Sequence, residues 1–106
     1  MTSPSPANSW KRVVVKLSGE ALMGDGQHGL DAPTLARIAR DLASAADTGV
    51  EIAVVVGGGN FFRGIQGADK GIERARADSI GMLATVMNAL AMEGALEQAG
   101  QSARVL

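Results

Sequence analysis

Two short runs of apolar, β-branched residues, separated by one helical pattern, constrain the fold more than any other feature of this sequence. The runs are Val13–Val15 and Ile52–Val56. Such runs are typical of strands that are buried on both faces of a parallel sheet. Two parallel strands need a crossover connection, and that crossover is almost always right-handed. The pattern therefore predicts a strand–helix–strand unit in an α/β layered fold.

The segment between the two runs carries the signals of an amphipathic helix with defined ends. Asp31 is placed to cap its amino terminus, Pro33 falls in its first turn, and Gly49 stands where a helix stop is expected. Apolar residues recur between these signals at helical spacing, at Leu35, Ile38, Ala39, Leu42 and Ala46. The glycine-rich stretch 23–29 that precedes the helix has no periodicity and is predicted to be a loop.

A second helix and a third strand are predicted near the carboxyl terminus. The helix is expected to run from Asp78, its N-cap, to about Ala99. Its shared apolar face would consist of Ile80, Leu83, Val86, Met87 and Leu90. A strand is expected to begin at Ala103, just before the sequence stops, so the sheet should continue past the last residue. Residues 1–10 are expected to form a disordered tail, and residues 11–106 the amino-terminal part of a single domain.

The composition narrows the possible functions. The chain has 106 residues, of which 46% are hydrophobic, so it forms one globular domain or part of one. A net charge of -1 gives no reason to expect binding to nucleic acid or to an anionic membrane. The absence of cysteine excludes disulfides and cysteine-based metal sites or nucleophiles. No apolar run approaches the roughly 20 residues that cross a bilayer, and no secretory signal opens the chain, so a cytoplasmic location is predicted.

Unusual residues follow both predicted strands, at the edge where ligands gather in open α/β sheets. The first strand leads into Lys16, Ser18 and Gly19, and the second into three consecutive glycines, Gly57–Gly59, followed by Asn60 and Arg63. Glycine loses much conformational entropy on folding, so three in a row indicate that something comes close to the backbone. A lysine ammonium beside exposed N–H groups suits a phosphate. Neither the P-loop motif nor the dinucleotide-binding glycine motif is present.

Each of these residues also has a plain structural explanation. Lys16 could be a surface lysine whose stem lies along the sheet, and the glycines could form only a tight turn. Arg63 could be a solvated loop residue, and Asp78 only a helix cap. His28, the only histidine, lies in a glycine-rich loop, so a metal site through it is not expected.

Three segments together are more specific than any single motif. They read "KRVVVKLSGEAL", "VVVGGGNFFRG" and "GMLATVMNALAM". In this order and at these separations they closely resemble the bacterial uridylate (UMP) kinases of the amino-acid kinase superfamily. The resemblance extends from about Lys11 to Leu106. It implies a three-layer αβα sandwich with a mainly parallel sheet. It also implies a cytoplasmic homo-oligomer, a hexamer. The reaction implied is the conversion of ATP and UMP to ADP and UDP in pyrimidine biosynthesis, with Mg²⁺ accompanying ATP.

The same resemblance implies a role for individual residues. Those expected at the ATP phosphates are Lys16, Leu17, Ser18, Gly19, Gly59 and Arg63, with Lys16 as the catalytic group. Those expected at UMP are Gly58, through its N–H, and Asp78, through a ribose hydroxyl. A segment that the family links to allosteric activation by GTP corresponds to Gly24, Asp25, Gly26, Gln27, His28 and Gly29. No metal-ligating side chain is expected.

Two other interpretations remain open at this point. The chain could belong to another amino-acid kinase, acting on a carboxylate or carbamate, which would share Lys16 and the glycines. It could instead be a non-catalytic module that binds nucleotide weakly or only oligomerises, because chains of the family are much longer. On either reading, the 106-residue chain alone is expected to be inactive.

Overall fold

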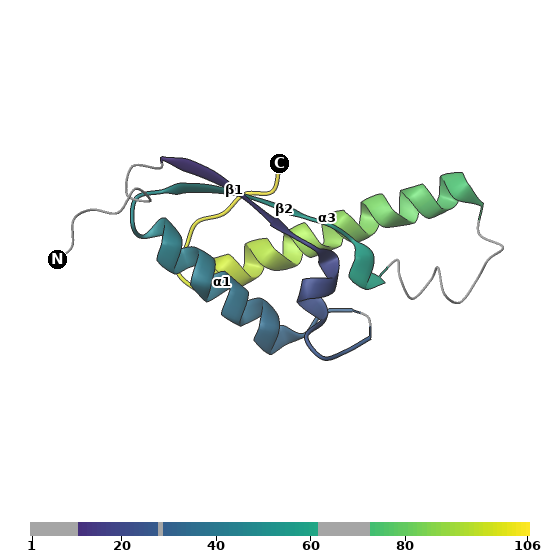
Figure 1. The fold of residues 1–106 in the computed structure, drawn as a ribbon, viewed down its shortest axis with the longest axis horizontal. Coiled ribbons are helices and arrows are strands. Elements are labelled where there is room, and N and C mark those ends of the chain that lie inside the picture. The colour runs from purple at the N-terminus through teal and green to yellow at the C-terminus, as the bar shows by residue number, and fades with distance from the viewer. Residues whose placement is uncertain (1–10, 28, 62–72) are drawn as a thin grey trace.

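The computed structural model describes residues 11–27, 29–61 and 73–106. The element order is β1 (Arg12–Leu17), the short 3₁₀ helix η2 (Gly19–Met23), α1 (Ala32–Ala46), β2 (Glu51–Val56) and α3 (Arg74–Gln98). Figure 1 shows α1 and α3 packed beneath the two strands, with the amino-terminal half of α3 extending beyond them. The predicted strand–helix–strand unit and its α/β class are confirmed.

Strands β1 and β2 form a parallel ladder whose two strands end at the same level. Arg12 lies opposite Glu51, and Leu17 lies opposite Val56. The ladder continues by one bond, because the Gly57 N–H donates to the Leu17 carbonyl at 3.1 Å. At the other end, Arg12 Nε lies 2.6 Å from Glu51 Oε1, and this hydrogen-bonded carboxylate raises the pKa of Arg12. The loops that follow the two strands therefore start side by side.

One face of the sheet packs on the helices and the other is open in the described part of the chain. The inward residues alternate along both strands, as strand geometry requires, and are partly or fully buried. On the other face, Val14 is 69% exposed and Val55 is 52% exposed. The prediction that the strands are buried on both faces is therefore wrong for the described residues, because α1 and α3 cover the same side.

Helix α1 begins and ends where the sequence predicts. The Asp31 carboxylate accepts from the Thr34 N–H at 3.1 Å and from the Thr34 hydroxyl at 2.5 Å. Gly49, after the helix, has a φ of +98°, which favours glycine. The helix contributes its predicted stripe to a core centred on Leu22, Ala39 and Met92.

Helix α3 differs from its prediction in both its start and its buried face. It begins at Arg74, so Asp78 lies in its second turn and is not the N-cap. The buried residues are Ala84, Asn88 and Met92, each four positions from the next. The predicted apolar face is instead turned outward, with exposed fractions between 49% and 64% for Leu83, Val86, Met87 and Leu90. The periodicity of the sequence identified a face made of large apolar side chains. The face of α3 that contacts Gly58 is instead one with small residues such as Gly81 and Ala84, because the helix comes very close to the backbone there.

Helix α3 is also long and apolar enough to cross a membrane, judged by length and composition alone. The prediction that no apolar run approaches this length is wrong by that criterion. The reason is that alanine, methionine and glycine continue the apolar character between the larger residues, with few charges among them. The core helix of a soluble protein can be equally long and apolar, but such a helix is mostly buried. In the most apolar 18-residue stretch of α3, only 17% is buried within the described structure.

The third strand predicted at Ala103 does not form within the described residues. The Val105 N–H donates to the Glu93 carboxylate of α3 at 3.2 Å and so has no strand as its partner. Residues 101–106 line, together with β2 and α3, a groove of about 900 Å³. The bond to Glu93 ties this segment to α3.

The close approach predicted at the triple glycine is made by α3. An ideal Cβ on Gly58 would lie 2.8 Å from the Cβ of Ala84 and 2.9 Å from the Gly81 carbonyl oxygen. Real Cβ atoms do not come so close to backbone, so the helix would have to move. The same construction on Gly57 meets nothing nearer than 3.7 Å. None of the three glycines has a positive φ, so the close contact with α3, and not the backbone conformation, is what a side chain at Gly58 would disturb.

We predict that Gly58→Ala destabilises the protein and that Gly57→Ala does not. The added methyl group at Gly58 overpacks the contact with α3, which costs about 1–3 kcal/mol. The urea-unfolding midpoints of the two variants and the wild type would measure this difference. Equal midpoints for the two variants would show that α3 yields freely to the extra atom.

Candidate functional site

The segments that follow β1 and β2 touch at the carboxyl edge of the sheet. An ideal Cβ on Gly19 would lie 2.6 Å from the Gly59 nitrogen and 2.9 Å from the Gly57 carbonyl oxygen. Gly19 is buried, so this contact leaves no space for a side chain. Gly19 and the glycine segment 57–59, which follow different strands, are therefore in direct contact.

Lys16 and its neighbours present different groups to this edge. Lys16 is exposed and lies on the open face of the sheet, paired in register with Val55. The Leu17 side chain points the other way and packs against the core, so only its backbone can face a ligand. The Ser18 hydroxyl oxygen accepts from the Ala21 N–H at 3.2 Å and caps η2.

The glycine backbone after β2 supplies hydrogen-bond donors at the same end of the sheet as Lys16. The Gly57 N–H is used by the ladder. Within the described part of the chain, the N–H groups of Gly58 and Gly59 have no backbone acceptor. A helical turn begins at Gly59, and N–H groups at such a start point away from the helix. Unpaired amide donors at the start of a helical turn are the kind of group that binds an anion such as phosphate.

A buried pair of asparagines, Asn60 and Asn88, forms hydrogen bonds to the backbone on the buried side of the glycine segment. Asn60 and Asn88 have no exposed surface. Their amides bond to each other reciprocally, at 3.1 Å and 2.7 Å. Asn88 Nδ2 also donates to the Gly57 carbonyl at 2.7 Å, and Asn60 Nδ2 donates to the Gly29 carbonyl at 3.0 Å. Sequence reasoning missed Asn88, although a lone amide side chain inside an apolar helix was a signal of a buried polar contact.

The remaining predicted site residues lie at different distances from this edge. Asp78 is exposed on α3, three positions before Gly81, whose carbonyl faces Gly58. Residues three apart on a helix are neighbours, so Asp78 lies about one turn from the Gly58 contact. Arg63 and His28 lie outside the described residues.

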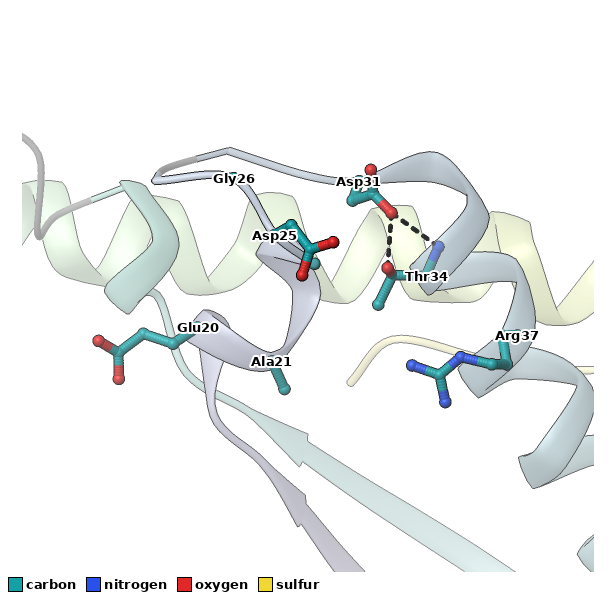
Figure 2. A pocket seen from close by; sticks show the side chains of 8 residues that line it. Glu20, Ala21, Asp25, Gly26, Asp31, Thr34 and Arg37 are labelled. Carbon is teal, nitrogen blue, oxygen red and sulfur yellow. Dashed lines mark hydrogen bonds between the residues drawn. The ribbon is translucent and has the colours of Figure 1, made fainter.

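The loop that contains Gly24, Asp25 and Gly26 borders a separate open pocket of about 430 Å³. Figure 2 shows Glu20 and Arg37 at opposite ends of it. Gly24 has a φ of +60°, and an ideal Cβ on it would lie 2.8 Å from an Asp31 carboxylate oxygen. The charged residues of the lining are three carboxylates, those of Glu20, Asp25 and Asp31, and one guanidinium, that of Arg37. This excess of negative charge disfavours the binding of a triphosphate.

Comparison with known proteins places these features in a family. The sequence profile of the Amino acid kinase family matches residues 11–106. The uridylate kinase of Roseobacter denitrificans is 58% identical over 100% of this chain, which covers 44% of that protein. The uridylate kinase of Hyphomonas neptunium is 62% identical over 91% of this chain, which covers 38% of that protein. This chain thus spans less than half the length of these relatives.

Solved structures agree with the sequence relatives. A UMP kinase from Bacillus anthracis superposes with a TM-score of 0.75 at 42% identity, covering 84% of this chain and 36% of that one. A UMP kinase from Ureaplasma parvum gives a TM-score of 0.75 at 31% identity, covering 86% of this chain and 40% of that one. The chain belongs to the amino acid kinase family, and its α/β fold is that of the UMP kinase structures.

Proposed function

We propose that this chain forms the phosphate-binding part of a UMP kinase that transfers the γ-phosphoryl group of ATP to UMP. One observation carries the proposal: the exposed Lys16 lies just before the end of β1, and the Gly58 and Gly59 N–H groups, which have no backbone acceptor among the described residues, follow the neighbouring strand that ends at the same level. The high identity to proteins named uridylate kinase supports UMP as the acceptor. A carboxylate or carbamate acceptor has no such support.

In this reaction a UMP phosphate oxygen forms a bond to the γ-phosphorus while the bond to the ADP oxygen breaks. The attacking oxygen is already anionic, so no general base is needed and positioning and charge stabilisation dominate. Lys16 offsets charge on the transferred group, and the backbone at Ser18, Gly19 and Gly59 faces the ATP phosphates. Gly58 donates its N–H to UMP and Asp78 accepts from the ribose.

Mg²⁺ belongs to this scheme as part of the substrate MgATP. Among the described residues no group of three histidine or carboxylate side chains could hold a metal ion. The described residues therefore do not fit a resident metal site.

The same proposal extends to regulation and assembly. Gly24, Asp25 and Gly26 of the segment that the family links to GTP border the open pocket, whose acidic lining would need additional cations to hold a triphosphate. The outward apolar face of α3 needs a cover in water, which supports a homo-oligomer. We place that oligomer in the cytoplasm and treat residues 11–106 as part of one kinase domain.

The reaction can be tested with the product of the complete reading frame that encodes this chain. We expect ADP and UDP to form from MgATP and UMP, with much slower phosphorylation of other nucleoside monophosphates. A carbamate and a small carboxylate serve as competing acceptors. Phosphorylation of either in preference to UMP would replace this proposal by another amino-acid kinase activity.

We predict that Lys16→Ala in that protein lowers kcat about 100-fold or more while leaving the unfolding midpoint nearly unchanged. Lys16 is exposed, so its removal costs little packing, whereas lost charge stabilisation in the transition state costs this order of rate. Lys11→Ala, which removes an exposed lysine just before β1, is the matched control. Equal turnover in the two variants would remove Lys16 from the mechanism.

We predict that the isolated 106-residue chain forms no UDP and self-associates. Its open sheet face and the outward face of α3 leave apolar side chains such as Val14, Met82 and Leu83 64–69% exposed. Such surfaces associate in water. Light scattering and a coupled ATPase assay would measure both properties. Rapid UDP formation by a monomeric chain would contradict both expectations.

A further inference from the structure

No step of the proposed reaction uses the side chain of Asn88, the buried asparagine of α3. This side chain nevertheless bonds directly to the glycine backbone. We propose that Asn88 is a positioning residue: by holding the Gly57 carbonyl, it aims the Gly58 N–H at the phosphate of the nucleoside monophosphate. The inference rests on the proposed function and adds the residue that orients one of its ligands.

The orientation of the Asn88 amide follows from chemistry. The Gly57 and Gly29 carbonyls can only accept hydrogen bonds, so the amide nitrogens of Asn88 and Asn60 must face them. Each amide oxygen then faces the other residue's nitrogen, as the reciprocal bonds at 3.1 Å and 2.7 Å require. No buried side-chain nitrogen or oxygen of the described residues is left without a partner. The pair therefore has one satisfied arrangement.

The carbonyl of Gly57 and the N–H of Gly58 belong to the same planar peptide group and point in opposite directions. Asn88 holds that carbonyl at 2.7 Å toward the buried side. The Gly58 N–H must therefore point away from Asn88, and it has no backbone acceptor within the described residues. The preceding peptide is fixed independently, because the Gly57 N–H bonds to Leu17.

A restraint of this kind is needed most at this position. The peptide lies between two glycines, whose wide conformational freedom makes its rotation inexpensive. A donor aimed before the ligand arrives avoids paying for that ordering on binding. The restraint comes from α3, which also packs against Gly58 through Gly81 and Ala84. The helix thus fixes both the place and the direction of this donor.

The test compares Asn88→Asp with Asn60→Asp in the product of the complete reading frame. Each variant keeps the side-chain shape and replaces one buried amide nitrogen by oxygen. Each loses the reciprocal bond and one bond to a backbone carbonyl. Only Asn88→Asp releases the Gly57 carbonyl. Their losses of stability should therefore be similar, and their effects on substrate binding should differ.

We expect Asn88→Asp to raise the KM for UMP about tenfold or more, because a hydrogen bond to a charged phosphate is weakened. In Asn88→Asp the KM for ATP should stay within about twofold of the wild-type value. In Asn60→Asp the thermal midpoint should fall by a comparable amount, but the KM for UMP should change by less than about threefold. Calorimetric titration with UMP alone checks that the change lies in binding.

Asn88→Ser is a second, uncharged variant, whose side chain is too short to reach the Gly57 carbonyl. If Asn88→Asp does not fold, the KM values of Asn88→Ser for UMP and for ATP are compared in its place. Equal effects of the Asn60 and Asn88 variants on the KM for UMP, or equal changes in the two KM values, would overturn the positioning role and leave the proposed function intact. A wild-type protein that forms no UDP would overturn both.

Discussion

The parallel ladder between β1 and β2 is the constraint on which the rest of the structure depends. Because Leu17 pairs with Val56 and the next N–H, that of Gly57, bonds to Leu17, both strands stop at one level. A shift of one residue would exchange the two faces of a strand and turn Lys16 toward the core. The register therefore decides both which side chains are buried and whether Lys16 and the glycines meet.

Local signals in the sequence were enough for the strand–helix–strand unit. Asp31, Pro33 and Gly49 mark helix ends through chemistry that acts within a few residues, and the structure follows them. The glycine run also indicated a close approach, although it did not identify α3 as the partner. That partner comes from a part of the chain more than twenty residues away, so no local pattern could name it.

The errors arise where tertiary packing overrides periodicity. Asp78 has the side chain of an N-cap, but the helix continues past it to Arg74. The large apolar residues of α3 share a face, yet the sheet end accepts only the small stripe that contains Ala84 and Asn88. The strand predicted at Ala103 does not form among the described residues, where the Val105 N–H bonds to the Glu93 carboxylate. The candidate site was predicted largely through its resemblance to a family, because neither generic phosphate motif occurs.

Every pair in the β1–β2 ladder joins residues 39 positions apart in the chain. During folding, this separation imposes a loop-closure entropy that must be met before the first ladder bond forms. Helix α1 and its cap involve only near neighbours and can order within that loop, shortening the distance that remains to be closed. We therefore expect α1 to become structured before the strands pair. The edge that gathers the phosphate-facing groups is then among the last parts of this unit to form.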